Sequence, residues 1–330
     1  MPELDSDPET TALNMPPMNE SMIAEPSTSL NVGKPALDFS AWMQERLART
    51  EYALSRWVGI NTPAGLGEAM RYAVLDGGKR LRPLLVWAAA EAVGGQAAAM
   101  LRAGCAVELI HAYSLVHDDM PCMDNDIMRR GKPTVHVQFG EASALLAGDA
   151  LQALAFELLL PEDEGIPCTM QAKLCRLLGA AAGGQGMAGG QAIDLASVGK
   201  QLDEAQLREM HRLKTGALLL GSVLMGAACN EKTDDAALAA LTDYGQALGV
   251  AFQVVDDILD VVADSATLGK TAGKDAANDK PTYVSLLGLD TARAHAEELR
   301  LQAHAALARS GLADTQALVA LADMVVQRTH

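Results

Sequence analysis

Two clusters of aspartate are the residues of this sequence best able to do chemistry, and each ends an apolar segment. Their members are Asp118, Asp119 and Asp124 in the first cluster, and Asp256, Asp257 and Asp260 in the second. Neighbouring carboxylates repel each other by about 1 kcal/mol per pair in water, and by more where solvent is partly excluded, so they need a cation. Hard oxygen ligands suit Mg²⁺, which is bound by one or two carboxylates together with substrate phosphates. A solvated, aspartate-rich helix end explains either cluster alone, whereas the presence of both favours metal.

The spacing within each cluster sets a geometric condition on metal binding. Asp256 and Asp260 are four residues apart and lie on nearly the same helix face. Asp118 and Asp124 would lie about 240° apart on an ideal helix. They can share one ion only if the helix ends or bulges between them, and Pro121 supplies a reason for such a break.

Cations gather near these carboxylates in a chain whose formal charge is −16. Lys79 and Arg82 follow a glycine pair, while Arg129 and Arg130 come soon after the first cluster. Arginine offers two parallel hydrogen bonds to phosphate oxygens and lysine a point charge, so these bases indicate an anion bridged to the carboxylates through metal. The alternative for the two arginines is simple neutralisation of Asp124 and Asp126.

Lys214, Thr215 and Gly216 form a third polar segment inside an apolar helix. Glycine costs about 1 kcal/mol relative to alanine in a helix interior. Its presence indicates either close helix packing or a local kink that turns a carbonyl towards a cavity. The glycine-rich run 183–191 lacks the features of a nucleotide-binding loop and predicts close packing, with Asp194 as a secondary polar candidate.

Composition predicts the fold class and argues against some classes of binding partner. Half of the residues are apolar (49%) but only 4% are aromatic, which favours a core of packed helices. The acidic balance argues against nucleic acid and anionic membranes, and no uncharged stretch is suited to stable membrane insertion. Five cysteines without a Cys-x-x-Cys pair, and no signal peptide, predict a cytoplasmic protein.

The chain divides into two parts of different composition. Residues 1–36 hold six of the 13 prolines, six acids and one base, which predicts a disordered extension. Helical periodicity then runs through residues 37–330, which we expect to form one all-α domain of roughly ten helices. Breaks are expected at Gly77-Gly78, Gly94-Gly95, 161–167, 183–190, 230–235, 267–280 and Gly311.

These residues form an ordered set that resembles the trans-isoprenyl diphosphate synthases, most closely the bacterial members that make farnesyl diphosphate. The resemblance covers nearly all of 37–330, and the ordered set is specific although each motif alone is weak. Its motifs are Gly77-Gly-Lys-Arg-Leu-Arg-Pro83, His111-Ala-Tyr-Ser-Leu-Val-His-Asp-Asp119, Asp124, Arg129-Arg-Gly-Lys-Pro-Thr134, Gly148-Asp-Ala150, Lys214-Thr215, Phe252-Gln253 and Asp256-Asp-Ile-Leu-Asp260.

The resemblance implies an isoprenoid synthase-type helical bundle around a central cavity, with both aspartate clusters at its mouth. It implies condensation of an allylic diphosphate with isopentenyl diphosphate, using Mg²⁺ or, as the alternative ion, Mn²⁺ held by the six aspartates. Arg129, Lys214 and Lys270 would contact the allylic diphosphate, and Thr215 and Gln253 would line the place where the carbocation forms. Isopentenyl diphosphate would be held by Lys79, Arg82, His111 and Arg130, and Lys280 is a further diphosphate contact. A homodimer is also carried over from the family.

Two residues before the first cluster bear on product length. Tyr113 lies five residues before Asp118, about 7.5 Å deeper along the helix axis, and Ser114 shares the face of Asp118. A bulky ring at this depth can stop a growing chain, and the family's aromatic residues here accompany a C15 product. We therefore expect farnesyl diphosphate, with geranylgeranyl diphosphate as the nearest rival.

Three other classes compete with this interpretation. A class I terpene cyclase usually replaces the second aspartate cluster, and a non-catalytic regulatory subunit typically loses ligands from one cluster; here both are intact. Glu108 and His111 form one Glu-x-x-His unit of the kind found in di-iron bundles, but such a bundle needs a second copy.

Overall fold

The structure is a computed structural model that describes residues 36–75, 77–162, 164–197, 199–200, 202–262 and 282–328. The predicted extension over 1–36, apart from Ala36, and the predicted break over 267–280 lie outside the described residues. Helices account for nearly all of the regular structure in these ranges, which confirms the all-α prediction. The described strands are β1 (Met128–Arg129) and β2 (Lys132–Pro133), which pair as a short antiparallel hairpin.

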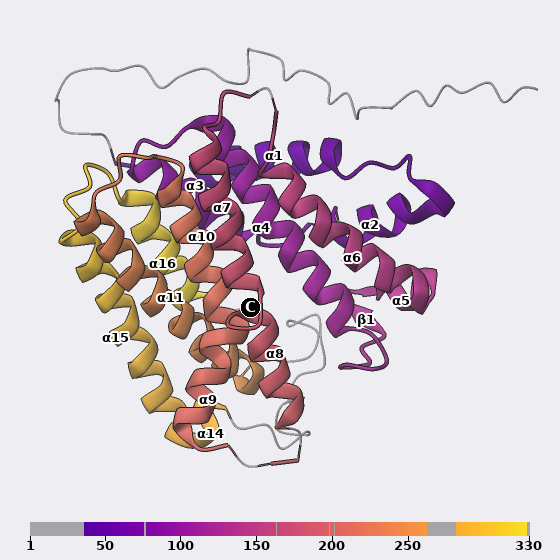
Figure 1. Ribbon diagram of the computed structural model, residues 1–330. Helices are drawn as coiled ribbons and strands as arrows, with labels where there is room; N and C mark the ends of the chain where they lie inside the picture. Colours follow the sequence, from indigo (N-terminus) through magenta and orange to yellow (C-terminus); the bar gives the residue numbers. More distant parts are fainter. Residues whose placement is uncertain are drawn as a thin grey trace, which may run out of the picture. The chain divides into compact units, whose positions relative to one another are not determined.

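Figure 1 shows the arrangement of the described helices. The first half contains α1 (Phe39–Trp57), the 3₁₀ turn η2 (Pro63–Gly65), α2 (Leu66–Val74), α3 (Leu81–Ala92), α4 (Ala97–Asp118), α5 (Val135–Phe139) and α6 (Glu141–Leu158). The second half contains α7 (Cys168–Ala182), α8 (Met187–Ala196), α9 (Glu204–His211), the π-helical turn η3 (Arg212–Gly216), α10 (Ala217–Ala228), α11 (Asp235–Val262), α14 (Tyr283–Leu287), α15 (Leu289–Ala308) and α16 (Gln316–Gln327).

Most of the predicted breaks separate two helices. Those at Gly77-Gly78, Gly94-Gly95, 161–167, 230–235 and Gly311 do so, while the break at 183–190 is shorter because α8 begins at Met187. Further breaks at 58–65, 197–203 and Gly288 were not predicted. Side chains supply several of the helix starts: Asp203 and Gln206 form a reciprocal capping box at α9.

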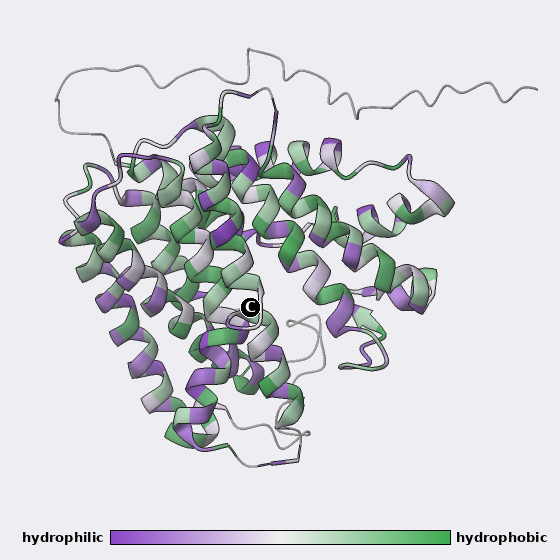
Figure 2. Ribbon diagram, in the orientation of Figure 1, coloured by the Kyte–Doolittle hydropathy of each residue, from purple (hydrophilic) through white to green (hydrophobic). Residues whose placement is uncertain are grey.

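Helices α4 and α10 form the centre of the core. Helix α10 packs against α3, α7 and α11, and α4 packs against α3 and α6. Leu109 and Ile110 of α4, and Leu218 and Leu219 of α10, are completely buried. Figure 2 shows the apolar character of these central helices, whereas α15 at the edge mixes hydrophilic and hydrophobic residues. The core is therefore built from small and aliphatic side chains, as the composition predicts.

Helix α4 is the one described helix whose length and composition would allow it to cross a membrane. In this structure 72% of its apolar window is buried inside the protein. Burial by neighbouring helices accounts for its apolar character.

Candidate active site

The first aspartate cluster lies where α4 ends. The helix stops at Asp118 and Asp119 caps it, so the helix end expected between Asp118 and Asp124 is confirmed. The chain then folds back, and the Asp124 backbone N–H donates to the Asp118 carbonyl over 2.8 Å. Asn125, with φ of 52°, completes this turn. Ending the helix brings back together two residues that a continuous helix would hold on different faces.

Asp118 is surrounded by groups that oppose one another electrostatically. Burial raises its pKa to about 6, the Lys214 ammonium lowers it, and the Asp124 and Asp119 carboxylates raise it further. Burial is the largest cause of this upward shift, so the Asp118 carboxylate lies where its negative charge is poorly solvated. An added cation would therefore be favoured here.

Asp119 and Arg129 form a two-pronged ion pair. The Arg129 guanidinium donates from Nε to both carboxylate oxygens, at 3.0 and 2.8 Å, and from Nη2 to Oδ1 at 2.6 Å. Arg129 ends β1, and the turn to β2 has positive φ at Arg130 (52°) and Gly131 (76°). This tight turn separates the two arginines, so Arg130 instead donates from Nη1 to the Gly77 carbonyl over 2.8 Å. Arg129 thus does neutralise an aspartate of the first cluster.

The second cluster occupies the last turns of α11. Asp256 is half-buried, and Asp260, one turn later, is only 7% exposed. Arg328 reaches Asp256 Oδ1 from Nη2 over 3.4 Å and the Phe252 carbonyl over 2.6 Å. Its guanidinium also lies over the Phe252 ring, 4.0 Å from the centroid. Arg328 was not singled out from the sequence, because an isolated arginine near a chain end carries no motif.

Asp257 belongs to a different set of contacts from Asp256. It is 3% exposed and accepts hydrogen bonds from Gln253 Nε2 at 2.8 Å and from the Tyr283 backbone N–H at 2.7 Å. Gln253 in turn accepts from Thr215 Oγ1 at 3.3 Å. Thr215 and Gln253, predicted to line one place, are therefore in direct contact.

Residues of the turn η3 interact both with α4, which carries the first cluster, and with α11, which carries the second. Thr215 contacts α11 through Gln253, while the preceding Lys214 is close enough to Asp118 of α4 to influence its pKa. Lys214 Nζ also pairs with Asp194 Oδ2 at 2.6 Å, which gives that secondary candidate a partner. A Cβ on Gly249 of α11 would lie 3.0 Å from the Gly216 Cα. The close packing expected at Gly216 is confirmed, and the helix also widens there into a π turn that was not predicted.

The four residues predicted to hold isopentenyl diphosphate, Lys79, Arg82, His111 and Arg130, are called the cationic group here, and three of them (Arg82, His111 and Arg130) influence one another electrostatically. Burial and the nearby Arg82 and Arg130 guanidinium groups hold the pKa of His111 well below its usual range, so this imidazole is neutral. Burial also lowers the pKa of Arg82 to about 10. Lys79 has its pKa lowered by burial and by Arg328, and raised by Asp256. Lys79 therefore lies close to the second aspartate cluster.

The residues proposed to control product length line the last turns of α4. Tyr113 is half-buried and its ring meets the His117 ring edge-on, with centroids 5.7 Å apart. The Ser114 hydroxyl donates to the His111 carbonyl over 2.8 Å. His117 contacts the Leu145 carbonyl at 3.1 Å, which indicates a packing role for that imidazole. Lys270 and Lys280 lie outside the described residues.

The carboxylates of this site fit a divalent ion that is bound partly by the protein and partly by a substrate phosphate. Within the described ranges, no three carboxylate, imidazole or thiol groups converge closely enough to hold an ion by themselves. Asp118 and Asp124 nevertheless present hard oxygen donors close to each other, joined by the bond from the Asp124 backbone N–H to the Asp118 carbonyl. Mg²⁺ commonly takes one or two carboxylates and completes its shell with water and substrate phosphates. Asp118, Asp124, Asp256 and Asp260 are suited to such shared sites.

The raised pKa of Asp118 predicts a pH-dependent penalty in the metal-free protein. The folded state holds this proton up to about pH 6, whereas the unfolded chain releases it near the ordinary value of 3.8. Wild type should therefore lose stability relative to Asp118→Asn as the pH rises through this window. Thermal melting with a chelator present, from pH 3.5 to 7, measures the difference. Parallel curves for the two proteins would contradict it.

Comparisons with known proteins agree with this arrangement. The chain matches the polyprenyl synthetase family over residues 63–320. It is 46% identical over 300 residues to farnesyl diphosphate synthase of Escherichia coli (strain K12), spanning 88% of this chain and 99% of that one. It is 43% identical over 296 residues to a chloroplastic geranylgeranyl pyrophosphate synthase of Catharanthus roseus, spanning 89% of this chain and 83% of the other.

The fold is shared with solved structures as well. The apo structure of an FPP/GFPP synthase from Zymomonas mobilis superimposes with a TM-score of 0.78 at 40% identity, covering 88% of this chain and 99% of that one. Together with the family match over 63–320 and the ordered motifs around η3, this similarity identifies the chain as a member of the polyprenyl synthetase family.

Proposed function

We propose that this protein condenses isopentenyl diphosphate with dimethylallyl or geranyl diphosphate to give farnesyl diphosphate. The observation that carries the proposal is the position of η3 between two carboxylate clusters, with Lys214 influencing Asp118 and Thr215 bonded to Gln253. A separate cationic group beside the second cluster can hold a second diphosphate. Two diphosphate sites on one cavity are what a prenyl transfer requires.

The residues of this chain divide the work between the two substrates. Lys214 and Arg129 contact the allylic diphosphate and stabilise the charge that develops as its carbon–oxygen bond breaks. Divalent ions held by the aspartates would neutralise the departing diphosphate, as Mg²⁺ does in phosphate chemistry. Thr215 and Gln253 direct oxygen atoms towards the allylic cation.

Isopentenyl diphosphate binds at the cationic group of Lys79, Arg82, His111 and Arg130. The neutral imidazole of His111 donates a hydrogen bond without adding charge, and the arginines offer paired donors. The alkene attacks the allylic cation, and the released diphosphate accepts the proton that is lost. Aliphatic walls hold no nucleophile that could trap the cation.

Mg²⁺ is the proposed ion and Mn²⁺ its alternative, with the six aspartates of the two clusters as candidate ligands. The aspartates differ in whether an ion pair must be broken before they can bind a metal ion. Asp256 is paired with Arg328 and Asp119 with Arg129, whereas Asp118 and Asp124 make no ion pair within 4.0 Å to any described residue. Asp118 and Asp124 are therefore the ligands we expect to bind metal first.

Radiolabelled isopentenyl diphosphate, offered with each allylic primer and with Mg²⁺, tests the proposed function. Incorporation into a C15 product with dimethylallyl or geranyl diphosphate is the expected result. A predominant C20 product would favour the geranylgeranyl alternative. No incorporation with any primer would reject the synthase and leave a non-catalytic subunit. The pairing of Glu108 with Arg80 already removes the di-iron alternative for that glutamate.

Replacing Tyr113 with alanine is expected to lengthen the product. The half-buried ring lies one helical turn and a half below Asp118, so its removal opens room for another isoprene unit. Tyr52→Ala is the matched control, because the Tyr52 side chain on α1 is 55% exposed. Mass spectrometry of the products should show C20 for Tyr113→Ala and C15 for the control. An unchanged distribution in Tyr113→Ala would remove Tyr113 from this role.

The homodimer carried over from the family has support in an exposed apolar surface. Val137, Leu145 and Leu146, on α5 and α6 at the edge of the bundle, are 50%, 47% and 55% exposed (Figure 1). A second copy of the chain covering this surface would bury them. Light scattering should report twice the mass of one chain, and a monomer at micromolar concentration would contradict the dimer.

The proposed location is the cytoplasm, in keeping with five free cysteines.

A further inference from the structure

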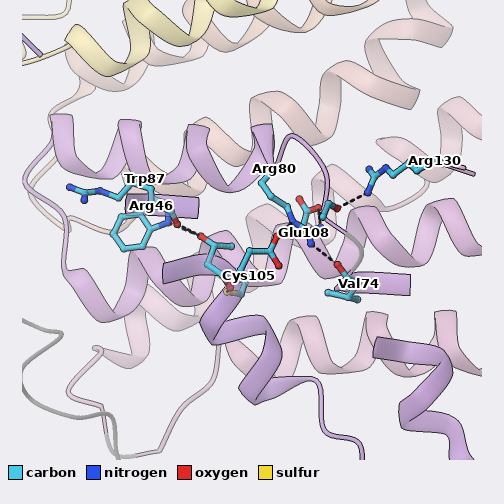
Figure 3. Close-up of polar contacts among 10 residues, drawn as sticks. Arg46, Val74, Arg80, Trp87, Cys105, Glu108 and Arg130 are labelled. Carbon is cyan, nitrogen blue, oxygen red and sulfur yellow. Dashed lines mark hydrogen bonds and ion pairs between the residues drawn. The ribbon is translucent and has the colours of Figure 1, made fainter. Parts of the chain in front are cut away.

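Arg80 differs from Lys79 and Arg82 because each nitrogen of its buried guanidinium donates a hydrogen bond inside the protein. It is 4% exposed and donates from Nε to Glu51 at 2.6 Å and from Nη1 to Glu108 at 2.7 Å. Its Nη2 donates to the Val74 carbonyl at 2.5 Å. Figure 3 shows the guanidinium between Glu108 and Val74. Arg80 thereby connects α1, α2 and α4 to the start of α3, and its guanidinium is directed into the protein rather than towards a diphosphate.

The backbone at Arg80 depends on these contacts. Arg80 precedes α3 with φ of 45°, a left-handed conformation that costs roughly 1–2 kcal/mol for a residue with a side chain. The flanking residues Lys79 and Arg82 belong to the cationic group. Lys79 is exposed, and the buried Nε of Arg82 has no hydrogen-bond partner in the described part of the chain. The conformation of Arg80 therefore sets the directions in which both neighbours point.

Glu108 is the buried carboxylate beneath this group. It is 3% exposed on α4, one turn before His111, and its charge favours the charged forms of Arg82 and Arg130. Burial lowers the pKa of both guanidinium groups, and Arg130 lowers that of Arg82 further. A buried anion is what allows cations to gather here before a substrate arrives.

We propose that Glu108 is a positioning residue for the isopentenyl diphosphate site. Through Arg80 it fixes the start of α3, and with it the directions of Lys79 and Arg82. It does not touch the substrate. The inference rests on the proposed function. It assigns a role in the isopentenyl diphosphate site to Glu108, whose Glu-x-x-His spacing otherwise suggests a metal ligand.

The variant Glu108→Gln tests this role, since it keeps the shape and removes the charge. We expect the KM for isopentenyl diphosphate to rise by about 10-fold to 100-fold, the effect of losing a charged hydrogen bond. The KM for geranyl diphosphate should be unchanged, because its contacts lie around Lys214 and Arg129. Equal rises in both KM values, or no rise in either, would overturn the proposal.

Glu164→Gln is the matched control, in the segment between α6 and α7. Glu164 pairs with Arg102 of α4, which is 2% exposed, through bonds of 2.5 and 2.6 Å. The control therefore breaks an ion pair to another buried arginine of the core, with a carboxylate side chain that is 30% exposed and an arginine outside the cationic group. It should lower the melting temperature and leave both KM values unchanged. A selective rise in the KM for isopentenyl diphosphate in Glu164→Gln would overturn the inference.

The double variant Arg80→Gln with Glu108→Gln separates positioning from stability. Removing both charges avoids the unpaired buried ion, so the melting temperature should recover relative to either single variant. The KM for isopentenyl diphosphate should stay high, because the start of α3 is still unanchored. Recovery of this KM together with stability would show a merely structural role.

Two further measurements keep the test decisive. If Glu108→Gln does not fold, Glu51→Gln replaces it, since Glu51 is the partly exposed second partner of Arg80. A smaller but still selective KM rise is expected there, and its absence would overturn the proposal. Wild-type incorporation of isopentenyl diphosphate is measured in parallel. Its absence rejects the proposed function, whereas normal wild-type activity with unselective variants rejects only the role of Glu108.

Discussion

Asp118→Ala and Asp256→Ala should each reduce turnover by about 10²–10³-fold, the scale seen when one group that stabilises developing charge is removed. Each substitution removes a carboxylate from one of the two clusters flanking η3. Asp256→Ala also leaves Arg328 without its 3.4 Å partner. Steady-state assays with geranyl and isopentenyl diphosphate across a Mg²⁺ titration measure both the rate and the metal requirement.

Asp290→Ala is the control for both aspartate variants. Its side chain is 99% exposed on α15, which carries none of the proposed site residues. The control should keep the wild-type rate and metal dependence. A wild-type rate in Asp118→Ala or Asp256→Ala would contradict the assigned ligand roles, because the proposed chemistry depends on both clusters.

Gly190→Ala is the second change with a large expected effect, because Gly190 packs against the backbone of Lys214 in the turn η3. A Cβ at Gly190 of α8 would collide with the Lys214 backbone N and lie 2.5 Å from its Cα. Overpacking of this kind costs about 1–3 kcal/mol. It should also move Lys214 and Thr215, and a displacement of about 1 Å can reduce a rate about 10²-fold.

Gly184→Ala, in the same glycine-rich run, is the control for Gly190→Ala. A Cβ there meets no atom within 4 Å, so we expect wild-type activity and stability. Melting temperature and kcat are measured for both variants. If Gly190→Ala retained both properties, the close contact between α8 and η3 would not be needed to position Lys214.

The helices were predictable because local sequence determines them. Periodic apolar residues and paired glycines identified most of the breaks, and Pro121 indicated that α4 ends after Asp118. One of the missed breaks, at Gly288, involves a single residue between two helices. The sequence pattern on either side of Gly288 continues as helix, so only the observed φ of 80° reveals the turn.

The glycine-rich run shows what a local pattern can and cannot say. Its composition predicted close packing, and the structure confirms this. The partner of that packing, the backbone of Lys214, lies more than twenty residues away and could not be read from composition. At Gly216 the sequence left two alternatives open, close packing or a local kink, because a glycine within a helix is compatible with both.

The amino-acid sequence determined the all-α class, the two carboxylate clusters and the cationic residues that accompany them. Only the tertiary structure decided which charges meet: Arg129 with Asp119, Arg328 with Asp256, and Glu108 with Arg80. Helix formation depends on neighbours within one or two turns, which a sequence displays directly. Ion pairing depends on which helix faces pack together, and this joins Arg328 to a residue 72 positions away.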